Sequence, residues 1–137
     1  MSLYILDTDS LSLFARGHSP IVERVLSTPP YSLAVTVITV EEHVSGWYDV
    51  LRKATTDERL ALGYASLSQT VELLKSFRVL PFTRDAIARY RILSQQKLNV
   101  RRMDLRIAAT VLEFEGTLIT RNMVDFQRIP EIGRAHV

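Results

Sequence analysis

The sequence predicts a single α/β domain, residues 1–137, with a mostly parallel central sheet. Short apolar runs rich in β-branched residues alternate with longer segments in which apolar residues recur at helical spacing. The connections between these segments are short, as expected where each strand returns to the same sheet through a helix. With 47% hydrophobic residues the chain can fill one core, and no linker, internal repeat or low-complexity segment divides it.

The first part of the chain is predicted to contain two strands and two short helices. In chain order these are a strand at residues 3–6, a helix through Phe14, a helix near residues 21–26 and a strand at residues 32–38. Both strands are apolar runs, and the second is rich in β-branched residues. The first run breaks at Asp7, as a buried strand does where a turn begins. Asp9 and Ser10 offer caps for the first helix.

The rest of the chain is predicted to contain four longer helices and two further strands. These are helices from Thr39 to about residue 51 and at 56–75, a strand at 77–82, helices at 83–96 and 104–115, a strand at 117–120, and a loop with one helical turn at 122–130. Pro81 lacks an N–H donor, which places the third strand at or near an edge of the sheet. Gly116 ends the last long helix.

Four carboxylates stand where apolar elements meet turns, at Asp7, Glu42, Asp104 and Asp125. An unpaired buried charge costs several kcal/mol or more, so acids against apolar surface need a partner. In parallel sheets, ligands bind at the carboxyl ends of the strands. Asp7 directly follows the first strand, Glu42 comes just after the second, and Asp125 follows the last strand by a few residues. These three acids are therefore expected at one rim, which helix starts such as that at Asp104 commonly line too, and a divalent cation is their obvious partner.

Two of these acids also have a local structural interpretation near a helix start. Asp7 is equally typical of an Asx-turn or a helix cap, although Asp9 and Ser10 are predicted to be the better-placed caps. Thr39 and Glu42 match the capping box, in which the glutamate reaches back to the threonine amide. A carboxylate in that position cannot easily bind a metal as well.

The other two acids lie in the second half of the chain. Asp104 at a helix start is favoured by the helix dipole by about 0.3–1 kcal/mol. However, Ile107, Ala108 and Val111 share its helix face, so surface capping explains its placement poorly. Asp125, taken alone, is also typical of an ordinary loop acid. The joint placement of the acids, rather than any single one, indicates a site.

Composition and charge narrow the classes of function. The chain has no cysteine, which excludes disulfides and zinc–thiolate sites and is compatible with the cytoplasm. Oxygen ligands suit Mg²⁺ or Mn²⁺ rather than zinc or copper. The three histidines lack ligand spacing and are expected to be structural or solvated. No signal peptide or membrane-spanning segment is expected. The net charge is +2, and arginines gather between residues 84 and 106, which suits a polyanion or, alternatively, a solvated helix face.

The segments ILDTDSLS, SLAVTVITVEEHVSG and RRMDLRIAATVLEFEGTLITRNMVDFQRIP strongly resemble the PIN-domain family, and within it the VapC-type toxin ribonucleases. The resemblance covers nearly the whole chain in order, and the segment from DLRIAA to FQRIP is its most specific part. It implies a three-layer α/β/α sandwich. By position, the metal-binding acids of the family fall on Asp7, Glu42, Asp104 and Asp125, and its accompanying hydroxyl and amide fall on Thr120 and Asn122.

This resemblance implies a Mg²⁺- or Mn²⁺-dependent endoribonuclease that cleaves RNA phosphodiester bonds in the cytoplasm. It also implies a homodimer and a small inhibitory antitoxin of the VapB type, with no membrane association. The arginines expected to contact RNA are Arg101, Arg102, Arg106 and Arg121. The chain departs from the family at Asp9 and Met103, where asparagine is usual, and it ends soon after Pro130, where relatives often have a fuller last strand.

Other functions remain open at this point. A PIN-like module that binds RNA or protein without cleavage would have lost one of the acids, and all four are present. An aspartyl-phosphate phosphatase would use LDTDS as a nucleophile motif, but it needs a lysine, and Lys97 lacks the required context. A DNA nuclease of the flap-endonuclease kind carries extra acids and arch elements for which this chain has no room.

Overall fold

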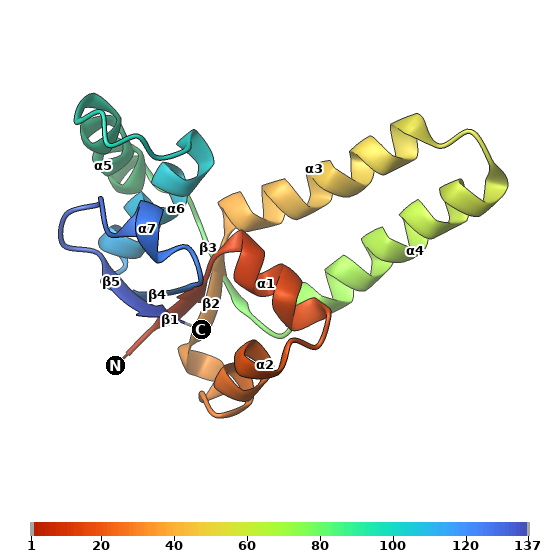
Figure 1. Ribbon diagram of the computed structural model, residues 1–137, viewed down its shortest axis with the longest axis horizontal. Helices are drawn as coiled ribbons and strands as arrows, with labels where there is room; N and C mark the ends of the chain where they lie inside the picture. Colours follow the sequence, from red (N-terminus) through yellow and green to blue (C-terminus); the bar gives the residue numbers. More distant parts are fainter. Residues whose placement is uncertain (1, 137) are drawn as a thin grey trace.

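Five parallel strands form the central sheet in the computed structural model, which describes residues 2–136. The strands are β1 (Tyr4–Leu6), β2 (Leu33–Thr36), β3 (Arg78–Leu80), β4 (Thr117–Thr120) and β5 (Gly133–His136). Their order in the sheet is β3-β2-β1-β4-β5 (Figure 1). All described pairs run parallel, so the predicted parallel sheet is confirmed.

Helices cover both faces of this sheet. They are α1 (Thr8–Ala15), α2 (Ser19–Leu26), α3 (Val37–Lys53), α4 (Asp57–Leu74), α5 (Arg84–Gln95), α6 (Arg102–Glu113) and α7 (Met123–Phe126), with a short 3₁₀ turn at Pro30–Ser32. Neighbouring strand residues point to opposite layers. Ile5 packs in a cluster with α5 and α6, whereas Leu6 packs in a second cluster with α1 and α2. The predicted three-layer α/β/α sandwich is therefore confirmed.

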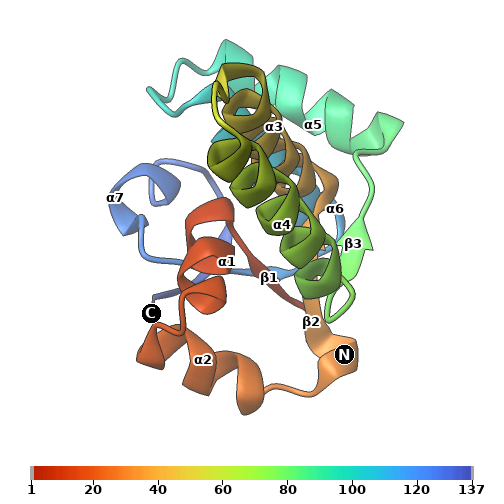
Figure 2. The same cartoon turned by 90° about the vertical axis from the view of Figure 1, so that its right-hand side faces the viewer.

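Helices α3 and α4 form a long antiparallel hairpin that projects away from the sheet (Figures 1 and 2). Only the first turn of α3 enters the core, through Ile38 and Thr39. Further out, Trp47 Nε1 donates to Thr70 Oγ1 at 2.9 Å and ties the two helices together. Several large apolar side chains on this hairpin remain exposed, including Tyr48, Leu62 and Tyr64. No helix within residues 2–136 combines the length and hydropathy that crossing a bilayer would need.

Most predicted elements are present within about two residues, but one helix start was predicted wrongly and one strand was not predicted. Helix α3 begins at Val37, not after Thr39, because Thr36 is the cap and its Oγ1 accepts the Thr39 N–H at 3.2 Å. Strand β5 was missed. Its sequence, GRAH, contains no β-branched residue and no Phe, Tyr or Trp, and pairing with β4 makes it a strand. The predicted edge position of the strand before Pro81 is confirmed, since β3 lies at the end of the sheet.

Gly116, between α6 and β4, allows a close approach of two chain segments. A β-carbon there would lie 2.6 Å from Ile5 Cδ1 and 3.2 Å from the Leu3 carbonyl oxygen. Ile5 is fully buried in the core, so a shift of its Cδ1 would disturb the side chains packed around it. We expect Gly116→Ala to lower the free energy of unfolding by about 1–3 kcal/mol, so the melting temperature followed by circular dichroism falls by roughly 3–10 °C.

Gly46→Ala is the matched control for this substitution. A β-carbon at Gly46 in α3 would meet nothing within 4 Å. The change to alanine should therefore stabilise the helix by about 0.5–1 kcal/mol. A Gly116→Ala protein that melts at or above the wild-type temperature would contradict the proposed steric conflict.

Candidate metal centre

One pocket of about 390 Å³ brings together the four predicted acids. Its lining is Asp7, Thr8, Asp9, Glu42, Arg101, Asp104, Asn122 and Asp125. These residues come from the end of β1, the start of α1, the second turn of α3, the start of α6 and the start of α7. The pocket thus lies at the carboxyl edge of the parallel sheet, where the topology concentrates polar side chains.

Asp7 forms the floor of the pocket and is also the N-cap of α1. Its Oδ1 accepts the Ser10 N–H at 2.9 Å, and its Oδ2 accepts the Thr120 hydroxyl at 2.6 Å. The prediction that Asp9 or Ser10 caps this helix was therefore wrong. Capping and metal binding are compatible, because each carboxylate oxygen keeps a further lone pair. Burial raises the pKa of the Asp7 carboxyl above its ordinary value of 3.8, and the hydrogen bonds offset this only in part.

Glu42 faces the pocket instead of the backbone of its own helix. Because α3 begins at Val37, the capping box predicted for Glu42 does not form. Its Oε1 accepts the Thr8 hydroxyl at 2.7 Å, and its Oε2 accepts Arg101 Nη1 at 2.9 Å. Both contacts join segments more than thirty residues apart in the sequence. Glu42 is therefore not occupied as a helix cap, and its carboxylate is directed into the pocket.

Asp104 lies in the first turn of α6 and is buried. Arg101 Nη2 donates to its Oδ1 at 3.2 Å, and Arg101 Nε donates to its Oδ2 at 3.4 Å. Burial raises the pKa of Asp104, while the Arg101 guanidinium partly offsets that rise. The expected burial of this acid among apolar neighbours agrees with the structure, since Ile107 and Ala108 are fully buried.

Asp125 closes the pocket from α7. Asn122 Nδ2 donates to its Oδ2 at 2.9 Å, and Arg128 Nη1 donates to its Oδ1 at 3.1 Å. Asn122 also caps the short helix, since its Oδ1 accepts the Asp125 N–H at 3.3 Å. The buried Thr120 hydroxyl accepts the Asn122 N–H at 2.8 Å. Thr120 thus joins Asp7 to the segment that carries Asp125.

Comparison with known proteins identifies the fold. No protein-family model and no curated protein matches the sequence. Among solved structures, VapBC-1 from nontypeable Haemophilus influenzae matches with a TM-score of 0.78 at 25% identity, over 98% of this chain and 97% of that chain. DNA-bound VapBC from Salmonella typhimurium matches with a TM-score of 0.78 at 22% identity, over 99% and 98%. The chain has the PIN-like fold of VapC-type proteins. A toxin–antitoxin complex from Klebsiella pneumoniae also matches, with a TM-score of 0.72 at 25% identity, over 94% of each chain.

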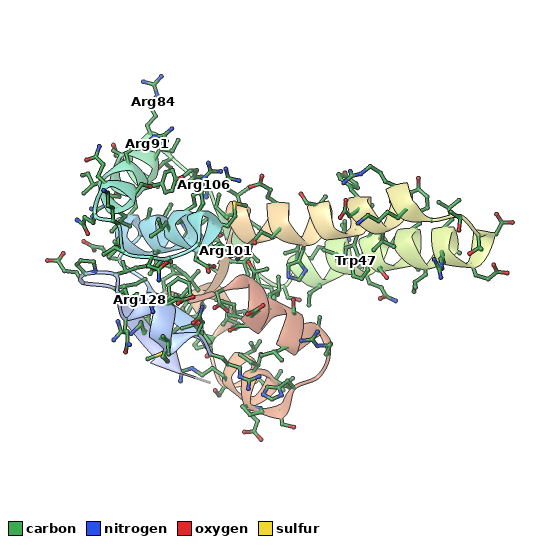
Figure 3. The ribbon with its side chains drawn as sticks, turned by 45° about the horizontal axis from the view of Figure 1, so that its top comes forward. Trp47, Arg84, Arg91, Arg101, Arg106 and Arg128 are labelled. Atoms are coloured by element: carbon green, nitrogen blue, oxygen red, sulfur yellow. The ribbon has the colours of Figure 1, made fainter. Side chains whose placement is uncertain are left out.

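The arginines expected to contact RNA lie in different places on this PIN-like fold. Arg101 lines the acidic pocket, whereas Arg102 and Arg121 are exposed and do not line it. The Arg106 guanidinium lies over the Tyr90 ring at 5.0 Å and the Phe82 ring at 5.9 Å. The structure therefore holds Arg106 between α5 and α6, where it packs against aromatic rings instead of lining the pocket (Figure 3).

A second cavity, missed by sequence reasoning, adjoins the acidic pocket. This groove of about 790 Å³ lies between α1, α3 and α4, and shares Thr8 and Glu42 with the acidic pocket. Trp47 and Leu73 contribute apolar surface to it. His43, predicted to be structural or solvated, lines the groove, and its Nε2 lies 3.4 Å from Ser12 Oγ. Trp47, a large side chain on the apolar stripe of α3, was the sequence feature that could have indicated this groove.

The two departures from the family pattern have different surroundings. Asp9 is exposed and lines the acidic pocket, which adds a fifth carboxylate to its lining. Met103 is partly buried and packs against the apolar cluster that contains Ile107. Asp9 therefore contributes charge at the pocket, whereas Met103 contributes to packing.

The donor atoms of the pocket fit a hard divalent cation by their chemistry, since carboxylate, hydroxyl and amide oxygens dominate it. In the part of the chain that the structure describes, no three Asp, Glu or His side chains are arranged to share one ion as they stand. Arg101 occupies oxygens of both Glu42 and Asp104. Binding of an ion to these two acids would require the guanidinium to move.

The raised pKa values of Asp7 and Asp104 predict how the stability of the metal-free protein depends on pH. Each folded pKa lies above the unfolded value near 3.8, so the contribution of these groups is fully present below pH 3.8 and is lost as pH rises through the folded pKa. The Asp7→Asn side chain does not ionise, so this variant does not lose the stability that the wild type loses when the Asp7 carboxyl ionises. In EDTA, we therefore expect the melting temperature of Asp7→Asn to rise relative to that of the wild type as pH increases from 4 to 8.

Circular dichroism melts of both proteins between pH 4 and pH 8 would measure this difference. It should be smallest near pH 4 and should increase with pH. A difference that stays constant, or decreases with rising pH, would show that the ionised Asp7 carboxylate is not destabilising in the fold.

Proposed function

We propose that this protein is a divalent-metal-dependent endoribonuclease of the VapC type, which hydrolyses RNA phosphodiester bonds. The observation that supports this most strongly is the meeting of four carboxylates in one pocket at the carboxyl edge of a PIN-like sheet. The solved structures with a similar fold are described as VapBC and toxin–antitoxin complexes.

Asp7 and Asp104 would hold the principal Mg²⁺ or Mn²⁺, and Glu42 and Asp125 would complete its shell or that of a second ion. Such ions activate water and neutralise phosphate charge during hydrolysis. The surrounding side chains fix the acids for this task. The Thr120 hydroxyl holds Asp7, and the Asn122 amide holds Asp125.

RNA would bind across the mouth of the pocket. Arg101 lines the pocket and Arg128 pairs with Asp125, and their side chains are 57% and 37% exposed. Arg102 and Arg121 are exposed and are the sequence neighbours of the pocket residues Arg101 and Asn122. Further out, Arg84 extends from α5 into solvent (Figure 3). Arg91 is also exposed, and its guanidinium lies 5.5 Å from the centre of the Tyr90 ring. Phosphate contacts of this kind give affinity without sequence specificity.

The neighbouring groove would accommodate an inhibitory partner of the VapB type. It is lined by apolar surface from Trp47 and Leu73, and it opens directly onto Glu42. A partner segment in the groove could therefore reach the acidic pocket and block it. The exposed apolar side chains of the α3–α4 hairpin, among them Leu62 and Tyr64, would support a homodimer. We place such a complex in the cytoplasm, with its RNA substrate.

Incubation of the purified chain with single-stranded and transfer RNA, in Mg²⁺, Mn²⁺ or EDTA, tests the proposed activity. Cleavage that requires the metal is expected. RNA binding of equal strength in EDTA and Mg²⁺ without cleavage would instead indicate a binding module. Hydrolysis of p-nitrophenyl phosphate would indicate a phosphatase, although Lys97 is exposed and does not line the pocket.

A further inference from the structure

The acidic pocket contains a cation supplied by the chain itself. The Arg101 guanidinium bonds to Glu42 Oε2 at 2.9 Å and to Asp104 Oδ1 at 3.2 Å. Arg101 immediately precedes α6, and its side chain reaches across to α3 (Figure 3). The guanidinium thus bridges one acid of α3 and one acid of α6, and its contact with Glu42 spans 59 residues of the sequence.

The atoms that Arg101 occupies are the oxygens that an ion would need. It engages both oxygens of Asp104 and one oxygen of Glu42. A guanidinium stays charged at any ordinary pH, so it cannot release these acids by losing a proton. Arg128 differs, because it touches only one oxygen of Asp125 and also donates to the Asn99 carbonyl oxygen.

The bridge is built so that its arginine can leave while its acids stay. The Arg101 side chain is 57% exposed, whereas the side chains of Glu42 and Asp104 are 15% and 13% exposed. The backbone of Arg101 is anchored by the Leu105 N–H, which donates to its carbonyl at 3.0 Å. Because more than half of the Arg101 side chain is exposed, the guanidinium can move into water without disturbing the core.

We propose that Arg101 is a mobile internal counterion that competes with the divalent cation for Glu42 and Asp104, and that the displaced guanidinium then binds a phosphate of the RNA. This inference rests on the proposed function and adds regulation of the same site. The ion and the RNA then assist each other, because each favours the arrangement in which Arg101 has left the acids. Arg101 is thus a competitor of the ion at the acids and a binding residue for the substrate.

Removal of the Arg101 charge is expected to strengthen the binding of the metal ion and to weaken the binding of RNA. Arg101→Gln should tighten Mn²⁺ binding about tenfold, the equivalent of about 1.4 kcal/mol, because the ion no longer displaces a cation. At saturating Mn²⁺, the same substitution should raise the KM for RNA several-fold. It should also lower the dependence of RNA binding on salt by roughly one phosphate contact.

Isothermal titration calorimetry with Mn²⁺ at constant ionic strength measures the first effect without reference to activity. Arg52→Gln is the matched control, since it removes the same charge from an exposed ion pair with Asp49 at the far end of α3. Its Mn²⁺ affinity should equal that of the wild type. Arg101→Lys keeps the competing charge, so its Mn²⁺ affinity should stay below that of Arg101→Gln. Melts in EDTA verify that each protein is folded.

A folded Arg101→Gln protein with wild-type Mn²⁺ affinity would overturn the proposal, as would a wild-type protein that binds no Mn²⁺. An increase shared by Arg52→Gln would also overturn it, because the effect would then reflect net charge alone. If Arg101→Gln binds Mn²⁺ more tightly but no protein of the series cleaves RNA, the competition is supported and the proposed function fails. If the wild type cleaves RNA while the Mn²⁺ affinities are equal, the function is supported and the role of Arg101 fails.

Discussion

Replacement of Asp7 by asparagine is expected to reduce metal-dependent RNA cleavage at least about a hundredfold, while the chain stays folded. Asp7 is the most deeply buried acid of the pocket, with 4% of its surface exposed, and Thr120 fixes its orientation. Asparagine is nearly isosteric and can still accept the Ser10 N–H that caps α1. It lacks the negative charge that binds the cation. Cleavage of a labelled RNA in Mg²⁺, compared by initial rates, measures the effect.

Asp49→Asn serves as the control for this experiment. Asp49 is a surface acid of α3 that pairs with Arg52 and Lys53 and does not line the acidic pocket. Its removal should leave the cleavage rate unchanged. An Asp7→Asn protein that retains Mg²⁺-dependent activity near the wild-type rate would refute the assignment of Asp7 as a metal ligand.

Addition of Mn²⁺ is expected to raise the melting temperature of the wild-type protein by roughly 9 °C at a concentration of one hundred times its dissociation constant. A ligand that binds only the folded state adds about 2.7 kcal/mol at that concentration. For 137 residues, the entropy of unfolding converts this into the stated temperature shift. The acids assemble from distant parts of the chain, so the unfolded chain offers no comparable site. Scanning fluorimetry over a Mn²⁺ titration measures the shift.

The same titration on Asp7→Asn and on Asp104→Asn separates site binding from general salt effects. Both substitutions remove a proposed ligand, so both should reduce the shift strongly. Absence of a shift in the wild type at any concentration would argue against the metal centre. Equal shifts in all three proteins would place the binding elsewhere on the chain.

Helix starts illustrate where local sequence rules were ambiguous. Thr39 and Glu42 match a capping box, yet the structure uses Thr36 as the cap, which turns the Glu42 carboxylate toward Thr8 and Arg101. Asp7, conversely, does cap a helix, although neighbouring residues fitted the rule as well. A shift of two residues in a helix start decides which way a side chain faces, because each residue turns by about 100°.

Other features depend on contacts between distant segments, and no local sequence pattern predicts them. Strand β5 has no β-forming residues and exists through its pairing with β4. The groove beside the acidic pocket is bounded by α1, α3 and α4, and its volume depends on how far the α3–α4 hairpin lies from α1. The contact of Arg101 with Glu42 spans 59 residues, so no local pattern predicts it.

The sequence by itself determined the alternation of strands and helices, the parallel sheet and the placement of acids at the ends of its strands. Hydrophobic periodicity and strand-end polarity are local properties that the order of residues records directly. The tertiary structure alone decided which oxygen atoms of those acids already have partners, and that an arginine of the chain is one of them. The pairing of Arg101 with Glu42 and Asp104 requires segments that come together only after the core has packed. The energy of an ion pair depends on the distance between its charges, so the sequence alone does not show which cation neutralises these acids.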